Sequence, residues 1–255
     1  MPQERVIVVM PAYNAGKTLR ETYESIPRHI VDEVILVDDV SEDETVAIAE
    51  GLNIKTIVHS ANKGYGGNQK TCYLQALDEG ADFIVMLHPD GQYDPRMIPQ
   101  LLEPLKRRQA DVVLGSRMLM KGGALEGGMP LYKYIANRFL TFLENFVLNL
   151  GLSEFHTGYR AYTRSFIETI PFLQNSNDFV FDTEIIAQVA IFNFNIAEVP
   201  VMTRYFREAS CVDFRVGLIY SLKTLLTLGK YLLHKLGLVK CKLFVPQDIQ
   251  KYGNL

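Results

Sequence analysis

The sequence has few cysteines, no excess of either charge and no unbroken apolar run of membrane-spanning length. Its three cysteines, Cys72, Cys211 and Cys241, lie far apart and form no C-x-x-C pair, so neither a disulfide framework nor a zinc knuckle is expected. A net charge of −3 without a long basic run gives no reason to expect nucleic acid as a partner. The apolar run at residues 6–10 is too short for a signal peptide, and no cleavage site comes after it. The spacing of the cysteines and the lack of a signal-peptide pattern together favour a protein of the reducing cytoplasm.

The chain does contain a regular alternation of apolar runs and helical patterns. Strands are predicted at residues 6–10, 33–37, 55–58, 83–87 and 111–114, with helices at 17–26, 43–50, 67–79 and 95–107 between them. This alternation is typical of βαβ units and predicts an α/β domain with a mostly parallel sheet. Ligands of such sheets bind beyond the carboxyl ends of the strands.

Polar residues come directly after the predicted strand at 83–87. His88, Asp90 and Gln92 occupy alternate positions there, so their side chains could converge on one divalent cation. A hard cation held by few protein ligands keeps positions open for substrate phosphates. The alternative is a simple turn, because Pro-Asp-Gly is ordinary turn chemistry.

The second half of the chain is less regular. The glycine-rich residues 120–130 predict a long mobile loop of the kind that serves as a lid or substrate-binding segment. Further strands are expected at 157–162 and 195–204, and a helix at 181–192. A helix is also expected at 132–150, and most of its apolar stripe is expected to pack in the core, with lipid contact as the alternative. The stripe consists of Ile135, Phe139, Phe142, Leu143, Phe146 and Leu150.

We divide the chain into a domain at residues 1–212 and a helical extension at 213–255. Residues 214–237 carry a leucine stripe and basic residues but no acidic one. Lys223 and Lys230 argue against a helix that crosses a bilayer. An amphipathic helix in the membrane interface fits better, with lysines toward anionic headgroups. The alternative is that the leucine stripe packs on the domain.

Six motifs occur together in one order: PAYNAGKTL from residue 11, VDDVSED from 37, NKGYGGNQK from 62, HPDGQYDP from 88, GSR from 115 and TGYRAY from 157. With these motifs the chain resembles the family 2 glycosyltransferases of the Rossmann-like GT-A fold. It is most similar to the branch of dolichyl-phosphate mannose synthase and bacterial polyprenyl-phosphate glycosyltransferases. The likeness is good over residues 6–162 and looser beyond them.

The resemblance implies a nucleotide-sugar donor, linked to UDP or GDP, and a Mg²⁺ or Mn²⁺ cofactor. It implies His88, Asp90 and Gln92 as metal ligands, and Asp90 as catalytic. The implied donor-binding residues are Pro11, Ala12, Tyr13, Asn14, Asp38, Asp39, Lys63, Gly67 and Asp90.

Two positions depart from the family pattern. His88 stands where relatives carry an acidic residue, which should weaken the hold on a hard cation, although a neutral imidazole can still bind Mn²⁺. Val40 stands where relatives commonly carry glycine. Because a β-branched residue resists a positive φ, we expect the turn after Asp39 to avoid one.

A phosphate acceptor is already an anion, so its binding site needs positively charged side chains more than it needs a general base. The resemblance implies Arg117 as the acceptor-phosphate arginine, and Arg204 is a second candidate. Glu154 stands where relatives carry an aspartate; for a hydroxyl acceptor, Glu154 or Asp182 would be the base. The QxxRW motif of processive relatives is absent, since the chain has no tryptophan.

The leading hypothesis is an inverting enzyme that moves one hexose, from a GDP-mannose or UDP-glucose type of donor, to a dolichyl or undecaprenyl phosphate. It would act at the cytoplasmic face of the membrane, with peripheral contact through residues 214–237. Two alternatives stay open: a transferase that acts on a sugar hydroxyl in glycan assembly, and a nucleotide-sugar-binding module without activity. The second of these is motivated by His88.

Overall fold

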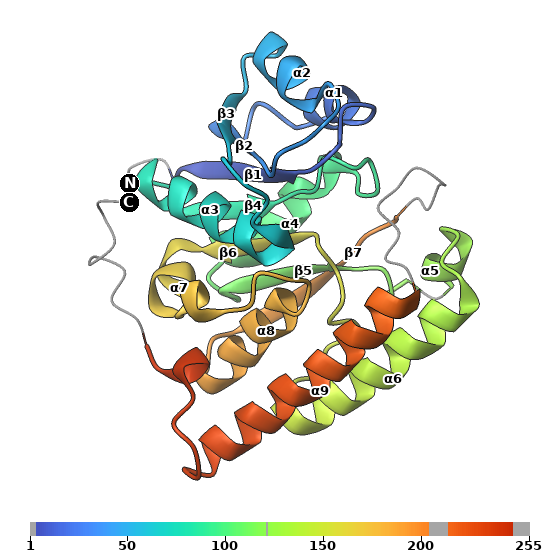
Figure 1. Cartoon of the computed structure of the whole chain (residues 1–255), viewed down its shortest axis with the longest axis vertical. Coiled ribbons are helices and arrows are strands. Elements are labelled where there is room, and N and C mark those ends of the chain that lie inside the picture. The colour runs from blue at the N-terminus through green and yellow to red at the C-terminus, as the bar shows by residue number, and fades with distance from the viewer. Residues whose placement is uncertain (1–3, 121, 204–213, 247–255) are drawn as a thin grey trace.

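The computed structural model describes residues 4–120, 122–203 and 214–246, and Figure 1 shows their arrangement. Within these residues the strands are β1 (Val6–Ala12), β2 (Glu33–Asp38), β3 (Lys55–Val58), β4 (Phe83–Met86), β5 (Val112–Ser116), β6 (Arg160–Thr163) and β7 (Ile196–Pro200). The α-helices are α1 (Leu19–Glu24), α2 (Thr45–Gly51), α3 (Gly64–Asp78), α4 (Ile98–Lys106), α5 (Gly123–Glu126), α6 (Leu131–Leu148), α7 (Arg164–Thr169), α8 (Phe181–Ile191) and α9 (Phe214–Lys235). Short 3₁₀ helices are η1 (Pro95–Met97), η2 (Phe172–Gln174) and η3 (Lys242–Phe244).

The strands form one sheet in the order β3-β2-β1-β4-β6-β5-β7. Among the described strands, β6 alone runs antiparallel to its neighbours, so the predicted mostly parallel α/β sheet is confirmed. The chain leaves β1 on one side for β2 and β3 and returns to its other side for β4. A crevice opens at such a switch point, beyond the carboxyl ends of β1 and β4.

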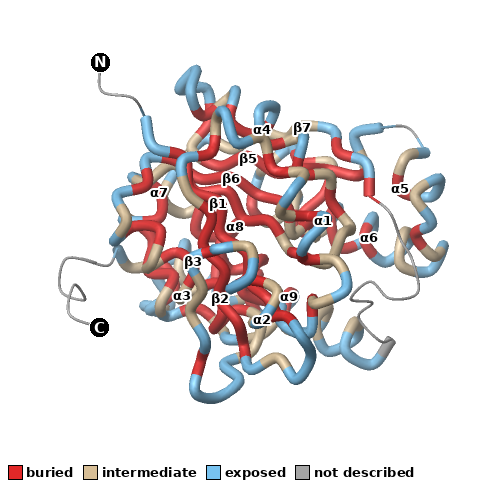
Figure 2. Tube along the Cα trace, turned by 90° about the horizontal axis from the view of Figure 1, so that it is seen from above, coloured by how far each residue is buried: buried red, intermediate tan, exposed pale blue. Residues whose placement is uncertain are grey.

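Both faces of the sheet are covered by helices, so its inner strands are buried on both sides, whereas the edge strands β3 and β7 are partly exposed (Figure 2). Alternate residues of β1 enter different cores, as the period of a strand requires. Ile7 and Val9 lie in one cluster with residues of α3, α7 and α8. Val8 and Met10 lie in the other with residues of α1, α2 and α4. The continuous apolar run of β1 therefore reflects burial of both faces.

The antiparallel strand β6 carries a distant part of the chain to the crevice. Arg160, its first residue, pairs with Met86 near the end of β4 and with Leu114 on β5. The loop that precedes β6 must therefore lie at the same sheet edge as the ends of β4 and β5. This is how residues 154–159 reach the residues that come after β1 and β4.

The prediction for the apolar stripe of α6 is wrong for most of its members. Phe139, Phe142 and Phe146 are 60%, 66% and 80% exposed, and Ile135 is exposed as well. Leu143 and Leu150 do pack against the core, in its partly buried margin. The face of α6 that is buried is more polar: it consists of Asn137, Leu140, Thr141, Glu144 and Leu148. The periodicity identified the helix correctly but not the side that faces the protein.

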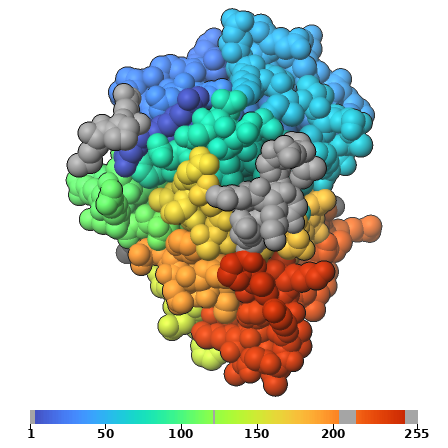
Figure 3. Space-filling model, turned by 90° about the vertical axis from the view of Figure 1, so that its left-hand side faces the viewer, coloured from blue at the N-terminus to red at the C-terminus, as the bar shows by residue number. Residues whose placement is uncertain are grey.

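The helix predicted at 214–237 is present as α9, and it lies beside α6 (Figure 1). Its buried face consists of Thr224, Thr227, Leu228 and Tyr231, and the last two belong to the same core cluster as α8. The leucine stripe faces outward: Leu218, Leu222, Leu225, Leu226, Leu232, Leu233 and Leu236 are all exposed. In the surface view of Figure 3, α9 lies at the end of the molecule away from the N-terminal strands. The alternative, that the leucine stripe packs on the domain, is therefore wrong.

Two other segments differ from expectation. The loop predicted at 120–130 contains the short helix α5, and Gly122 precedes it with a φ of +81°. The strand predicted at 195–204 ends at Pro200, after which Thr203 forms an isolated bridge with Tyr93.

The expectation that Val40 avoids a positive φ is also wrong, because its φ is +66°. Asp38 holds the turn in this conformation: its carboxylate accepts hydrogen bonds from the backbone N–H and the hydroxyl of Ser41. An L-residue in the left-handed region costs roughly 1–2 kcal/mol. The hydrogen bonds of Asp38 therefore hold the chain in a turn that glycine would adopt with less strain.

We expect Val40→Gly to raise the free energy of unfolding by about 0.5–1 kcal/mol, because relief of the strain exceeds the added entropy of the unfolded chain. The Val40 side chain is exposed, so little packing is lost. Urea denaturation should show a higher midpoint for the variant than for the native chain. A lower midpoint would mean that the turn is not strained.

Candidate active site

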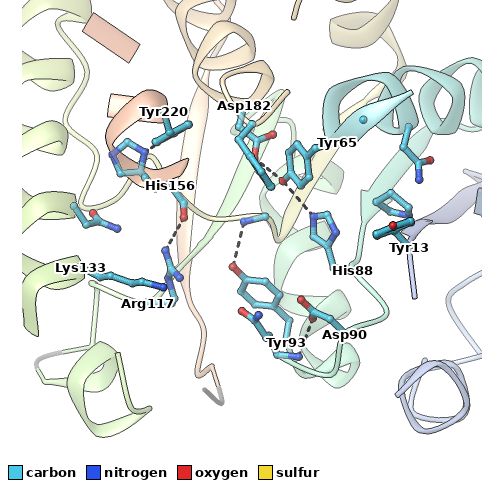
Figure 4. Close-up of a pocket in the computed structure, with 18 of the residues that line it drawn as sticks. Tyr13, Tyr65, His88, Asp90, Tyr93, Arg117, Lys133, His156, Asp182 and Tyr220 are labelled. Carbon is cyan, nitrogen blue, oxygen red and sulfur yellow. Dashed lines mark hydrogen bonds between the residues drawn. The ribbon is translucent and has the colours of Figure 1, made fainter. Parts of the chain in front are cut away.

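A cavity of about 710 Å³ lies at the switch point between β1 and β4 and extends to α6 and α9. Most of the residues implied by the sequence motifs lie in its wall. These are Pro11, Ala12, Tyr13, Asp39, His88, Asp90, Gln92 and Arg117. Figure 4 shows that Tyr13, His88 and Asp90 come from one side of the cavity and that Arg117, Lys133 and His156 come from the other.

Several residues expected at the site are not in the cavity wall. Asn14 is exposed, and its amide oxygen accepts a hydrogen bond from the Glu42 backbone. Neither Lys63, which is exposed, nor Gly67, which is buried, lines the cavity, and Glu154 is fully buried. Arg204 lies outside the described residues.

The two aspartates after β2 have different surroundings. Asp38 is fully buried and bonds to Ser41, so it shapes the turn and does not reach the cavity. Asp39 lines the cavity, and its carboxylate accepts hydrogen bonds from the backbone N–H groups of Lys63 and Gly64 at 2.8 and 2.9 Å. Asp39 thus ties the end of β2 to the start of α3.

The glycines at the start of α3 serve close packing between protein segments. A Cβ at Gly66 would lie 2.3 Å from the carbonyl oxygen of Ser176. The N–H of Gly66 donates to the carbonyl oxygen of Asn177 at 2.9 Å. The oxygen that approaches this glycine-rich segment therefore belongs to the protein.

Asp90 and Gln92 form a donor set that fits a divalent cation completed by substrate. One oxygen of Asp90 accepts a hydrogen bond from the backbone N–H of Gln92 at 3.0 Å, and both side chains line the cavity. In the part of the chain that the structure describes, no three His, Cys, Asp or Glu side chains cluster as a metal site. Mg²⁺ commonly binds through one or two carboxylates together with substrate phosphates, so Asp90 with Gln92 fits such an ion.

His88 is engaged with other side chains. Its ring stacks on Tyr65, and Nε2 lies 3.3 Å from the Tyr65 hydroxyl, which in turn donates to Asp182 at 2.8 Å. Gly158 makes room for this arrangement, since a Cβ there would lie 2.9 Å from Nε2. Burial lowers the pKa of His88, against the opposing influence of the Asp90 and Asp182 charges. A neutral imidazole at this position has one nitrogen committed to Tyr65.

Asp182 lines the cavity but is held by three neighbours. Besides the Tyr65 hydroxyl, the Gln69 amide donates to it at 3.2 Å, and the Arg160 guanidinium lies 3.4 Å away. Arg160 is fully buried, so Asp182 is the counter-charge that this arginine requires. These contacts favour a structural role for Asp182 over that of a base.

Arg117 and Glu154 form a buried ion pair. The backbone N–H and the Nε–H of Arg117 donate to the two carboxylate oxygens at 2.9 and 2.8 Å, and Nη2 also contacts the carboxylate. The Asn137 amide donates to Glu154 at 2.9 Å. Burial alone would raise the pKa of Glu154, but the charge and hydrogen bonds of Arg117, with that of Asn137, lower it below its usual value. Glu154 therefore orients Arg117.

The residues of the cavity wall that sequence reasoning missed include Tyr65, Lys133, His156 and Tyr220. Lys133 lies in the first turn of α6, directly after the glycine-rich segment, and this position was the one available signal. The other three reach the cavity only through the packing of α3, α9 and the loop before β6.

The chain is similar to known proteins over most of its length. The family model described as "Glycosyl transferase family 2" matches residues 7–170. The UDP-N-acetylglucosamine–dolichyl-phosphate N-acetylglucosaminyltransferase of Methanococcus voltae is 27% identical over 252 residues, which cover 91% of this chain and 100% of the relative. The undecaprenyl-phosphate mannosyltransferase of Micrococcus luteus is 27% identical over 204 residues, which cover 77% of this chain and 82% of the relative.

Solved structures share the fold. Glucosyl-3-phosphoglycerate synthase from Mycobacterium tuberculosis, crystallised with Mn²⁺ and UDP-glucose, superposes with a TM-score of 0.70 at 18% identity. The superposition covers 93% of this chain and 80% of that one. The fold is thus that of GT-A glycosyltransferases.

Proposed function

Because this chain belongs to glycosyl transferase family 2, we propose that it transfers a single hexose from a nucleotide-sugar to a polyprenyl phosphate. One observation carries the proposal. The cavity joins an acidic end at Asp90 to a cationic end at Arg117 and Lys133, and that cationic end lies beside two helices with exposed apolar faces. The M. voltae and M. luteus relatives are named for transfer to dolichyl and undecaprenyl phosphate, which supports the acceptor class.

The donor would bind at the side of Tyr13, Asp39 and Asp90. Tyr13 is 55% exposed at the cavity wall, so its ring has a face available for a nucleotide base. Asp90 and Gln92 would hold Mg²⁺ or Mn²⁺ against the donor diphosphate. Such an ion, when bound, stabilises the negative charge that develops on the leaving diphosphate. The relatives are named for different sugars, so the hexose type is part of the proposal.

The acceptor phosphate would bind at the side of Arg117 and Lys133. Arg117 is held by Glu154 and by the carbonyl oxygen of His156, to which Nη2 donates at 2.6 Å. A guanidinium fixed in this way suits phosphate oxygens, and the Lys133 ammonium adds a second cation. The chain's own task is then to hold a phosphate anion facing the anomeric carbon, on the side opposite the leaving group, which inverts the configuration.

Peripheral contact with an anionic membrane is expected from α6 and α9. Within the described chain, one helix, Arg215–Lys235, is long and apolar enough to cross a bilayer. One side of it is committed to the protein through Thr224, Leu228 and Tyr231, which favours an interfacial position. Glu144 is the sole acidic residue of the two helices, and it is fully buried, so their exposed charges are all basic. Basic charges beside exposed leucine and phenylalanine fit an anionic bilayer at the cytoplasmic face.

Replacing Phe139, Phe142 and Phe146 together by serine should reduce partitioning onto anionic vesicles by a factor of roughly 1,000 or more, since each buried phenylalanine contributes about 1.5–3 kcal/mol. Vesicle co-sedimentation measures the effect. Val58→Ser is the matched control, because Val58 is exposed on β3, away from these helices. Unchanged partitioning of the triple variant would show that α6 does not contact the lipid.

The function itself is tested by radiolabelled sugar transfer from UDP-N-acetylglucosamine, UDP-glucose and GDP-mannose into an organic-extractable lipid fraction. Parallel reactions omit polyprenyl phosphate, or replace Mn²⁺ by a chelator. We expect metal-dependent label in lipid with one donor. Nucleotide release without lipid label would overturn the acceptor class in favour of a sugar hydroxyl, and nucleotide binding without turnover would identify an inactive module.

A further inference from the structure

The aromatic side chain of Phe179 is exposed in the cavity and takes no part in the function proposed above. It lies between η2 and α8, is 39% exposed and lines the cavity. Its ring packs against that of Tyr65, with the two ring centroids 4.7 Å apart, and Tyr65 stacks in turn on His88 at 5.5 Å. Phe179 is thereby linked through Tyr65 to the residue that stands two positions before the proposed metal ligand Asp90.

This group of rings lies near the middle of the cavity. The Tyr65 hydroxyl donates to Asp182 at 2.8 Å. Figure 4 shows Asp182 between the donor side, with Asp90, and the acceptor side, with Arg117. The transferred sugar must lie between these two sides, because it is bonded to the donor diphosphate and is attacked by the acceptor phosphate. The rings therefore stand where the sugar has to pass.

From this arrangement we infer that Phe179 is a further donor-binding residue, whose ring packs against the C–H groups of the transferred sugar. A hexose has apolar C–H patches between its hydroxyls, and an exposed phenylalanine ring offers them an apolar surface of similar size. Binding sites for small molecules are commonly lined by aromatic side chains together with a few polar groups that fix the orientation. The inference rests on the proposed function, because it takes the ligand to be a nucleotide-sugar with its diphosphate at Asp90.

The glycine-rich start of α3 holds the segment that carries Phe179. A Cβ at Gly66 would lie 2.3 Å from the carbonyl oxygen of Ser176, so any larger residue would push this segment away from α3. One turn further along α3, the Lys70 ammonium donates to the side-chain oxygen of Asn177 at 2.7 Å. Gly66 and Lys70 are therefore positioning residues. The motif NKGYGGNQK would thus contribute to the donor site through the segment that packs against it.

The test compares Phe179→Ala and Phe179→Tyr with the native full-length chain, using the donor found active with the native protein and undecaprenyl phosphate in detergent micelles. We expect Phe179→Ala to raise the KM for the nucleotide-sugar roughly tenfold, and Phe179→Tyr, which retains the ring, to stay within about threefold of the native value. The KM for the acceptor should not change. The Kd of the nucleoside diphosphate alone, measured by calorimetry with Mn²⁺, should not change either, because this ligand carries no sugar.

A second pair of variants tests the positioning role. Gly66→Ala should raise the KM for the nucleotide-sugar, and its combination with Phe179→Ala should give no further rise, because both act through one ring. Gly51→Ala is the matched control, since a Cβ at Gly51 would meet nothing within 4 Å, and it should change no constant. If thermal denaturation shows that Gly66→Ala is unfolded, Lys70→Met takes its place.

The inference is overturned if Phe179→Ala leaves the KM for the nucleotide-sugar within twofold of the native value. It is also overturned if the Kd of the nucleoside diphosphate alone rises by the same factor, which would place the ring at the nucleotide, or if only the acceptor KM rises, which would place it at the acceptor. Each of these results is obtained with a native protein that transfers sugar to lipid, so the proposed function stands. If the native protein labels no lipid, the proposed function has failed, and the Kd of the nucleotide-sugar relative to that of the nucleoside diphosphate still tests the contact of Phe179 with the sugar.

Discussion

Asp90→Asn should lower kcat for sugar transfer by a factor of about 10²–10³, the range seen when one group that stabilises transition-state charge is removed. The amide can still accept the hydrogen bond from the Gln92 backbone, so the turn should persist. The variant loses the one carboxylate charge in the set of Asp90, Gln92 and His88. We expect the affinity for Mn²⁺, measured by electron paramagnetic resonance in the presence of UDP, to fall together with kcat.

Asp94→Asn provides the matched control. Asp94 caps η1 and pairs with Arg96 at the surface, and it is not in the cavity wall. This variant should retain native kcat and native Mn²⁺ binding. If Asp90→Asn kept kcat within threefold of the native value, with the same metal dependence, Asp90 could not be the principal metal ligand.

Arg117→Leu should both abolish transfer to polyprenyl phosphate and lower the free energy of unfolding by about 3–5 kcal/mol, because it leaves Glu154 charged, buried and unpaired by its guanidinium. Adding Glu154→Leu should restore most of the lost stability, since an apolar pair can replace a buried ion pair at little net cost. Chemical denaturation measures the stability, and lipid labelling measures the activity.

The double variant separates the two roles of this pair. It should be stable but inactive, because the guanidinium that we propose binds the acceptor phosphate is still missing. A double variant that is as unstable as Arg117→Leu would mean that Glu154 has other essential contacts. One that transfers sugar would remove Arg117 from the acceptor site, and Glu154 could then not be acting as its support.

The residues just beyond the strands could be predicted from sequence because their position at the sheet edge depends only on the strand that precedes them. A buried parallel strand is a continuous apolar run, and the residues after its carboxyl end lie at the ligand edge of the sheet. Pro11, Asp39 and Asp90 were placed in this way, and all three line the cavity. Asp38 and Asn14 are exceptions, since the strand period turns the Asp38 side chain toward Ser41 and Asn14 is exposed.

The orientation of α6 could not be predicted, because periodicity identifies an apolar face but not what covers it. Phe142 would have the same spacing in a core as on a lipid surface. Glu144 on the opposite face is fully buried, and Nε2 of His156, in the loop before β6, lies 3.0 Å from its Oε2. Lys133 and Tyr220 were missed for a similar reason: their place at the cavity depends on how α6 and α9 pack.

The position of β6 in the sheet has a consequence for the order of folding. β1 to β4 pair with one another and can assemble as they leave the ribosome. β5 and β7 pair with each other but join that group only through β6, which comes after α6 in the chain. Contacts between residues this far apart in sequence form slowly, because a long loop must close first. The half of the sheet proposed to bind the donor can therefore form early, whereas the half proposed to bind the acceptor is completed only when β6 has paired with β4 and β5.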